Sequence, residues 1–234
     1  MNVFAAPGEV FDEIKTSKPS TANWLVPVLC SCLVGVIYVM IIFSQPTVQQ
    51  QLREQQAKKF EQMVKEGKMK AEDAEQAKAK LEAMGPTLTK IFGSAGAIVA
   101  SFVWLLLLAG VLKLAGRVLF KAAFPYQKAL EAAGLASMIT ILSAVINMLL
   151  VVAMGNMFVT PGPALFVRDF DPANKTHLIL SSVNVMTLWY VGVLAIGLAR
   201  LSAVSFGKAA LWLYGLWLVL RAVMIFAGLA ASGM

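Results

Sequence analysis

The sequence predicts an all-α, polytopic membrane protein with five transmembrane helices and one helical hairpin outside the membrane. Composition is the first observation, because hydrophobic residues make up 59% of the 234 residues and charged residues only 14%. In ordinary soluble domains about a quarter of the residues are charged. The second observation is a mean hydropathy of +0.73. The third is a set of charge-free stretches, several of which reach the roughly 20 residues that a helix needs to cross a bilayer core.

These stretches define the five spans in order. Residues 24–43 and 91–112 carry no charge and predict the first two spans. No charge occurs in residues 132–167 either, but the sequence Pro161-Gly162-Pro163 cannot continue a helix, so we expect the third span to end near residues 154–158. The fourth span is predicted over residues 178–199. The fifth is predicted over residues 209–231, with a single charge at Arg221.

The domain organisation follows from these spans. We expect an N-terminal segment over residues 1–23, the first transmembrane helix over 24–45, an outer helical hairpin over 46–90, and transmembrane helices two to five within 91–234. The first span is expected to be retained, not cleaved as a signal peptide. Acidic residues precede it, and the sequence Phe43-Ser44-Gln45-Pro46 after it lacks an A-x-A-like cleavage site.

Basic residues in the short loops predict the orientation. Two of them, Arg168 and Lys175, lie in the third loop. Eight lie on the opposite side: Lys15, Lys18, Lys113, Arg117, Lys121, Lys128, Arg200 and Lys208. Cytoplasmic loops carry the excess of Lys and Arg, so we expect a cytoplasmic N-terminus and a C-terminus on the outer side of a bacterial inner membrane. The first loop holds nine basic residues, but seven acidic residues are interleaved with them.

The hairpin prediction comes from two amphipathic stripes. The first stripe is followed by Glu66-Gly67-Lys68, and the second is ended by Gly85-Pro86. Two alternatives stay open: the stripes cover each other, or they dock a partner protein. The residues predicted to bind a partner are Leu52, Phe60, Met63, Leu81 and Met84. The stripes are too poor in large apolar residues for a strong membrane-surface helix.

Motifs for catalysis or metal binding are absent from the sequence. Cys30 and Cys32 are the only cysteines, they point to different faces of one helix, and His177 is the only histidine. Neither an H-E-x-x-H nor a G-x-S-x-G motif occurs. We therefore expect no catalytic residue, no metal site, no cofactor and no enzymatic activity, and we expect no nucleic-acid partner.

Three polar residues lie within predicted spans, where polar side chains are costly and usually face the bundle interior. They are Asn147, Asn184 and Arg221. Arg221 lies 12 residues after Ala209, which is roughly 18 Å along a helix. These three residues are the predicted ligand-binding set. A hydrogen-bonded clasp between spans is the other explanation, and the sequence leaves both open.

Several short motifs, taken in order, resemble the Ypt-interacting protein (Yip) domain family. They are Pro7, Val10-Phe11, Ile14, Trp24 and Pro27, then Phe124, Ala129-Leu130 and Gly134, then Leu188-Trp189, Leu194-Ala195-Ile196-Gly197-Leu198 and Ser205-x-Gly207-Lys208-Ala209-Ala210. The resemblance implies a five-span helical protein with a cytoplasmic N-terminus. Eukaryotic relatives associate with Rab-type GTPases in vesicle traffic. The Asp-Leu-Tyr-Gly-Pro motif of those relatives is missing, so the resemblance favours the bacterial branch, without Rab binding.

We therefore expect a non-enzymatic scaffold or accessory subunit of a membrane assembly or transport system. The alternative is a carrier or lipid-handling protein that uses the Arg221 and asparagine site. Expected partners are membrane lipids and a protein that binds the hairpin or the bundle; a second copy of the chain is a further candidate.

Overall fold

The computed structural model describes residues 2–167 and 170–227, and it leaves out the side chains of residues 81–84 and 86. Within these residues the regular structure is entirely helical, which confirms the predicted all-α fold. Five helices are long and apolar enough to cross a membrane, as predicted. They are Ala22–Ile42 (α2), Thr87–Val118 (the second part of α4), Tyr126–Met154 (α5), Val185–Ser202 (α7) and Phe206–Phe226 (α8).

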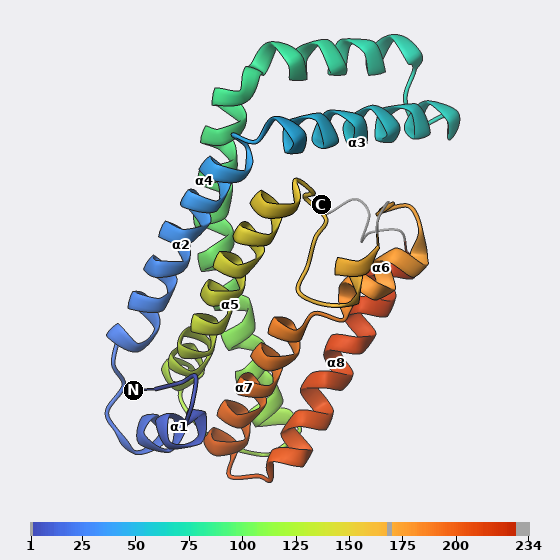
Figure 1. Ribbon diagram of the computed structural model, residues 1–234. Helices are drawn as coiled ribbons and strands as arrows, with labels where there is room; N and C mark the ends of the chain where they lie inside the picture. The colour runs from blue at the N-terminus through green and yellow to red at the C-terminus, as the bar shows by residue number, and fades with distance from the viewer. Residues whose placement is uncertain (1, 168–169, 228–234) are drawn as a thin grey trace.

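The five long helices form one bundle (Figure 1). Helix α2 packs against α5 and α4, and α7 packs between α5 and α8. Small buried residues such as Ala132, Ala136 and Ala195 allow these close contacts. Helices α2 and α5 approach closely at Gly134, where an added Cβ atom would lie 2.5 Å from the Cα of Trp24.

Helix α1 (Pro7–Thr16) lies at one end of the bundle, which we name the α1 end (Figure 1). Pro7 begins the helix, a position that needs no intrahelical N–H bond. Phe11 and Ile14 are fully buried, and the Phe11 ring lies against Gly197 of α7, 3.2 Å from where a Cβ atom would be. The opposite face is acidic and exposed, and Asp12 pairs with Arg200 at 3.3 Å. The N-terminal segment is therefore packed onto the bundle.

The predicted single fourth span over residues 178–199 is wrong. The chain instead forms α6 (Lys175–Ser182), then a break, then α7 (Val185–Ser202). At the break the Val185 N–H donates to Pro161 O at 3.1 Å. A loop with a short 3-10 helix, η1 (Pro163–Phe166), supplies that carbonyl. Hydropathy does not reveal this break, because the bonds that make it possible come from a distant loop.

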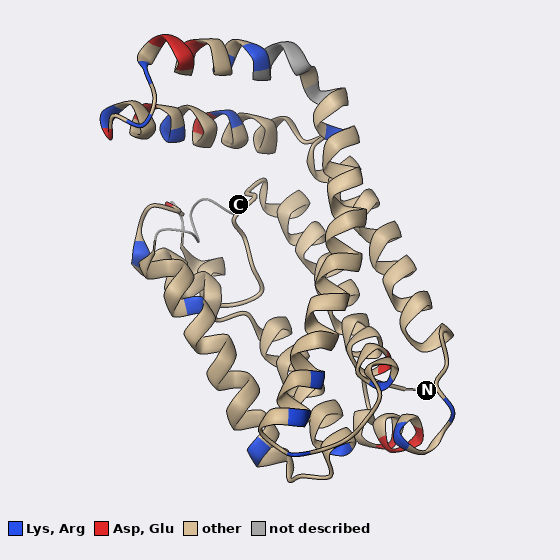
Figure 2. Ribbon diagram, turned by 180° about the vertical axis from the view of Figure 1, so that it is seen from behind, with Lys and Arg blue, Asp and Glu red and all other residues tan. Residues whose placement is uncertain are grey.

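Most charged residues gather at the two ends of the molecule, with few between them (Figure 2). The third membrane-spanning helix, α5, ends at Met154, inside the range predicted for its end. Gly155 closes it in the left-handed conformation with φ 62°, which favours glycine. An apolar band with charged ends is the pattern of a bilayer-spanning bundle.

The hairpin consists of α3 (Pro46–Lys65) and the first part of α4 (Ala71–Val118), which lie side by side and run crosswise to α2 (Figures 1 and 2). We name the end of the bundle that carries it the hairpin end. The turn is a Schellman motif, in which Lys68 N–H donates to Met63 O at 2.9 Å and Gly67 N–H donates to Val64 O at 3.0 Å. At Gly85, with φ 65°, α4 bends from the hairpin into its membrane span. The span therefore continues directly from the second hairpin helix.

Candidate functional site

The base of the hairpin is fixed to the bundle. Val48 is 1% exposed and packs with Ile42, Val151 and Val159. Next to it, both polar atoms of the Gln51 amide bind the loop after α5. Nε2 donates to Gly155 O, and Oε1 accepts from Met157 N–H, each at 2.9 Å. A buried apolar contact with two hydrogen bonds gives α3 a fixed direction at its origin.

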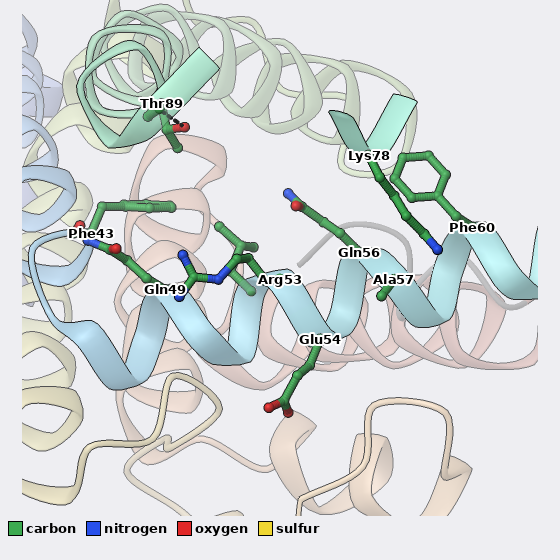
Figure 3. A pocket seen from close by; sticks show the side chains of 11 residues that line it. Phe43, Gln49, Arg53, Glu54, Gln56, Ala57, Phe60, Lys78 and Thr89 are labelled. Carbon is green, nitrogen blue, oxygen red and sulfur yellow. Dashed lines mark hydrogen bonds between the residues drawn. The ribbon is translucent and has the colours of Figure 1, made fainter. Parts of the chain in front are cut away.

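Between α3 and the start of α4 lies a groove of about 640 Å³, which we name the hairpin groove (Figure 3). This volume is within the range of small-molecule ligand pockets. The residues that line it from α3 and from the start of α4 include Leu52, Arg53, Glu54, Gln56, Ala57, Phe60 and Lys78. The facing helices therefore leave a space between them that no described residue fills.

The groove has an apolar floor with basic groups beside it. Leu52, Ala57 and Phe60 come from one side of α3 and supply the floor. Arg53 is exposed. Lys78 reaches from α4 beside Phe60 (Figure 3), and its Nζ pairs with Glu75 Oε1 at 2.9 Å. Glu54 lines the edge, but its carboxylate points away from α4 (Figure 3) and accepts a hydrogen bond from Gln50 at 2.9 Å. The groove thus offers an apolar surface and positive charge.

The residues predicted to bind a partner fall into three groups. Leu52 and Phe60 both line the groove. Met63 is 36% exposed and is not among the lining residues. Leu81 and Met84 have side chains outside the described part of the structure. Whether any of them binds a partner stays a prediction.

At the tip of the hairpin Glu66 is held by two neighbours. Its carboxylate lies 2.5 Å from Lys68 Nζ and accepts a hydrogen bond from Gln62 Nε2 at 2.8 Å. These hydrogen bonds, that to Lys68 above all, lower the pKa of Glu66 below its usual range. The carboxylate therefore stays charged at neutral pH and is already paired with Lys68. Its contacts stabilise the turn at the tip of the hairpin.

Asn147, one of the three predicted ligand contacts, forms a clasp. Its Oδ1 accepts from the Tyr38 hydroxyl of α2 at 2.8 Å, and its Nδ2 donates to Val159 O at 2.7 Å. The side chain therefore joins α2, α5 and the loop after α5 through both of its ends. This is the structural alternative that the sequence left open for this residue.

Asn184 is a helix cap. It lies at the break before α7, where its Oδ1 accepts from Met186 N–H at 2.9 Å and from Thr187 N–H at 3.4 Å. Asparagine is one of the preferred residues for satisfying the free N–H groups at a helix start. The sequence placed Asn184 inside a continuous helix, and the break in the fourth span gives it this different position.

Arg221 lies five residues before the end of α8. Its depth in the membrane is therefore nearer the hairpin end than the middle position expected from a span over residues 209–231. Residues 228–231 lie outside the described part of the chain. Arg221 makes no hydrogen bond or ion pair with a described residue. Arg221, Asn147 and Asn184 are not among the residues that line the hairpin groove.

Sequence reasoning missed a buried ion pair at the α1 end. Glu131 is fully buried, Lys128 is 5% exposed, and Lys128 Nζ lies 3.3 Å from Glu131 Oε1. The other Glu131 contacts are with the link before α2: Ser20 N–H donates to Oε1 at 3.2 Å, and Asn23 Nδ2 donates to Oε2 at 2.7 Å. The sequence clue was a lone acid three residues after a lysine, inside the apolar stretch Ala129-Leu130-Glu131-Ala132.

The comparison with protein families is consistent with this architecture. A sequence model described as the Yip1 domain matches residues 1–229, and so includes α1, the hairpin and all five spans. Comparisons with curated proteins and with solved structures gave no significant match. The motifs at residues 7–27, 124–134 and 188–210 that suggested the family all lie inside the matched range. The chain belongs to the Yip1 domain family.

Proposed function

We propose that this Yip1-family membrane protein is a non-enzymatic scaffold or accessory subunit that holds a partner protein in the hairpin groove. The observation that carries the proposal is the groove itself, about 640 Å³ between two helices that project from the bundle. A hairpin whose helices covered each other would serve stability alone. A hairpin that keeps its apolar floor open presents a surface for another chain.

The composition of the groove favours a particular kind of partner. Leu52 and Phe60 lie eight residues apart on α3, about 12 Å at 1.5 Å per residue, which suits the apolar stripe of a short helix. Arg53 lies exposed beside this floor, so acidic residues flanking that stripe would be attracted. We therefore infer an amphipathic helix with acidic flanks as the occupant. The fixed base at Val48 and Gln51 reduces the ordering cost of binding.

Aspartate at the groove floor is expected to abolish this binding. A photo-crosslinking amino acid at Ala57 should capture one defined protein in cells, and Phe60→Asp or Leu52→Asp should reduce the crosslinked product more than tenfold. Burying one such side chain is worth about 1.5–3 kcal/mol, and an unpaired charge in its place adds a further cost. The amount of each inserted protein is measured in parallel by blotting the membrane fraction.

Met63→Asp is the matched control, because Met63 is on the same helix but outside the groove. It should leave the product unchanged. Equal crosslinking in the Phe60 and Met63 variants would show that the captured protein does not use the groove.

We further propose a bacterial inner membrane location with the α1 end in the cytoplasm. Eight basic residues of the short loops on one side against two on the other support this orientation. With Cys30 and Cys32 replaced by alanine, Lys58→Cys on α3 should react with an impermeant thiol reagent in intact cells. Lys208→Cys should react only after lysis. The reverse pattern would invert the topology and place the groove in the cytoplasm.

The carrier or lipid-handling alternative now depends on Arg221. The side chains of Asn147 and Asn184 already accept hydrogen bonds within the fold, whereas Arg221 has no described partner and is half-buried. An arginine within a span costs about 2.5–3.5 kcal/mol at the helix centre, less toward its end, so an anionic lipid phosphate is a chemically suitable partner.

Arg221→Leu tests this alternative. If a lipid phosphate pairs with Arg221, the Leu variant should copurify with several-fold less anionic lipid while its thermal stability in detergent stays nearly unchanged. Lys208→Leu, at the other end of the same helix, is the control for nonspecific loss of positive charge. Equal lipid content in all three proteins would leave Arg221 as a side chain that only extends to the membrane surface.

A further inference from the structure

A second cavity, of about 100 Å³, lies inside the bundle where α2, α4, α5 and α7 meet. It shares no lining residue with the hairpin groove. The lining residues that bear polar groups are Ser31, Ser101, Trp104, Ser137, Thr140 and Tyr190. None of the described residues that line it is charged. We name this space the hydroxyl cavity.

Tyr190 gives the cavity an unused hydrogen-bond donor. Tyr190 is 8% exposed, and its hydroxyl is buried next to Trp104 without a hydrogen-bond acceptor among the described residues. Trp104 lines the same cavity, but an indole N–H can only donate, so it cannot accept the Tyr190 proton. Buried polar groups nearly always have a partner, counting ordered water. Among the described residues the Tyr190 hydroxyl therefore has no acceptor for its proton, and a ligand in the cavity can supply one.

The other hydroxyls give the cavity unused acceptors. Each one donates its proton to a carbonyl of its own helix, at 3.0 Å for Ser31, 2.8 Å for Ser101, 2.5 Å for Ser137 and 2.7 Å for Thr140. A hydroxyl oxygen that has donated its proton still has two lone pairs. The cavity thus combines the Tyr190 donor with four acceptor oxygens, and this set suits an uncharged ligand that both donates and accepts.

We propose that the hydroxyl cavity is a binding site for hydroxyl ligands, held by a hydrogen bond from Tyr190. A water molecule takes about 30 Å³ of liquid volume, so about 100 Å³ suits roughly three ordered waters. One three-carbon polyol supplies the same three hydroxyl groups. Water and polyol share the chemistry that the lining residues recognise, and the experiments below distinguish them. The proposal does not depend on the hairpin groove.

The position of the site makes its ligand structurally important. Tyr190 lies 12 residues before the end of α7, about 18 Å from the α1 end of that helix. A hydroxyl ligand there would connect α7 to α2, α4 and α5 at a depth where bulk water does not reach.

Radiolytic hydroxyl-radical footprinting of the full-length protein in detergent tests for bound water. Ordered water beside a buried ring makes that ring reactive, so Tyr190 should be oxidised about tenfold faster than the fully buried Phe11, after correction for intrinsic reactivity. Ser137→Leu, which fills the cavity, should reduce Tyr190 oxidation to the rate of Phe11. Thr140→Val keeps the side-chain volume and removes one acceptor; it gives a second variant if Ser137→Leu does not fold.

Saturation-transfer NMR with glycerol as the probe tests whether a polyol binds in the hydroxyl cavity. Transfer to glycerol should be about three- to tenfold weaker in Tyr190→Phe, the effect of losing one hydrogen bond. Tyr214→Phe is the matched control, because its hydroxyl donates to Leu188 O at 2.7 Å. Sucrose, which is too large for the cavity, should show no Tyr190-dependent transfer. Tyr190 oxidation without glycerol transfer identifies water as the ligand. Absence of both signals means a dry cavity and overturns the proposal.

Discussion

Glu131→Gln should lower the free energy of unfolding by about 3–5 kcal/mol, the cost of leaving one partner of a buried ion pair without its counter-charge. Lys128 is 5% exposed and Glu131 is fully buried. Among the described residues Lys128 Nζ has no hydrogen-bond partner, so its contact with Glu131 at 3.3 Å is what compensates its charge. Glutamine keeps the shape and the acceptor for Asn23 but removes the charge. Thermal and denaturant unfolding in a fixed detergent measure the loss.

Two comparisons make this result specific. The double variant Lys128→Met with Glu131→Gln removes both charges, and it should recover most of the lost stability because the uncompensated charge is gone. Glu9→Gln changes an exposed acid of α1 and should have an effect within about 0.5 kcal/mol. If the double variant were as unstable as the single one, the stabilisation would come from packing or from the hydrogen bonds to Ser20 and Asn23, not from charge.

Gly134→Ala should destabilise the protein by about 1–3 kcal/mol through overpacking. Its Cβ atom would lie 2.5 Å from Trp24 Cα and 3.0 Å from Asn23 O. Both are backbone atoms, so no side-chain rotation relieves the clash and α2 has to move away from α5. Unfolding in detergent measures the loss, and crosslinking between cysteines on α2 and α5 reports the separation.

Gly96→Ala is the matched control. Gly96 is also inside a membrane-spanning helix, but nothing lies within 4 Å of its Cβ position. Alanine there should leave stability unchanged or raise it by up to about 1 kcal/mol, since glycine is the poorer helix former. Equal effects of the two substitutions would contradict the close approach of α2 and α5.

Hydropathy predicted much of the fold, because a bilayer imposes length and polarity on each span. The 20 uncharged residues 24–43 and the helix Ala22–Ile42 agree within two residues at each end. The break before Val185 was not predictable, because it depends on a hydrogen bond to Pro161 and on the Asn184 cap. The packing of α1 on α7 was not predicted either, since it depends on a glycine 186 residues further along the chain than Phe11.

The candidate site was predicted in part. The stripe on α3 pointed to Leu52 and Phe60, which both line the hairpin groove. Their spacing alone could not show whether the second helix covers them, because that depends on how α4 bends at Gly85. The hydroxyl cavity was not predicted, since serine and threonine are common inside membrane helices and only the assembled bundle brings Ser31, Thr140 and Tyr190 together. Asn147 and Asn184 were singled out because polar side chains are costly inside a membrane. Both make hydrogen bonds within the fold.

The contact of Phe11 with Gly197 has a consequence for the order of biogenesis. Helix α1 is synthesised first, but the surface that covers it belongs to α7, which leaves the ribosome almost 190 residues later. Until α7 has been inserted, the apolar face with Phe11 and Ile14 lacks its final packing partner. The start of the polypeptide is therefore among the last parts to reach its native position.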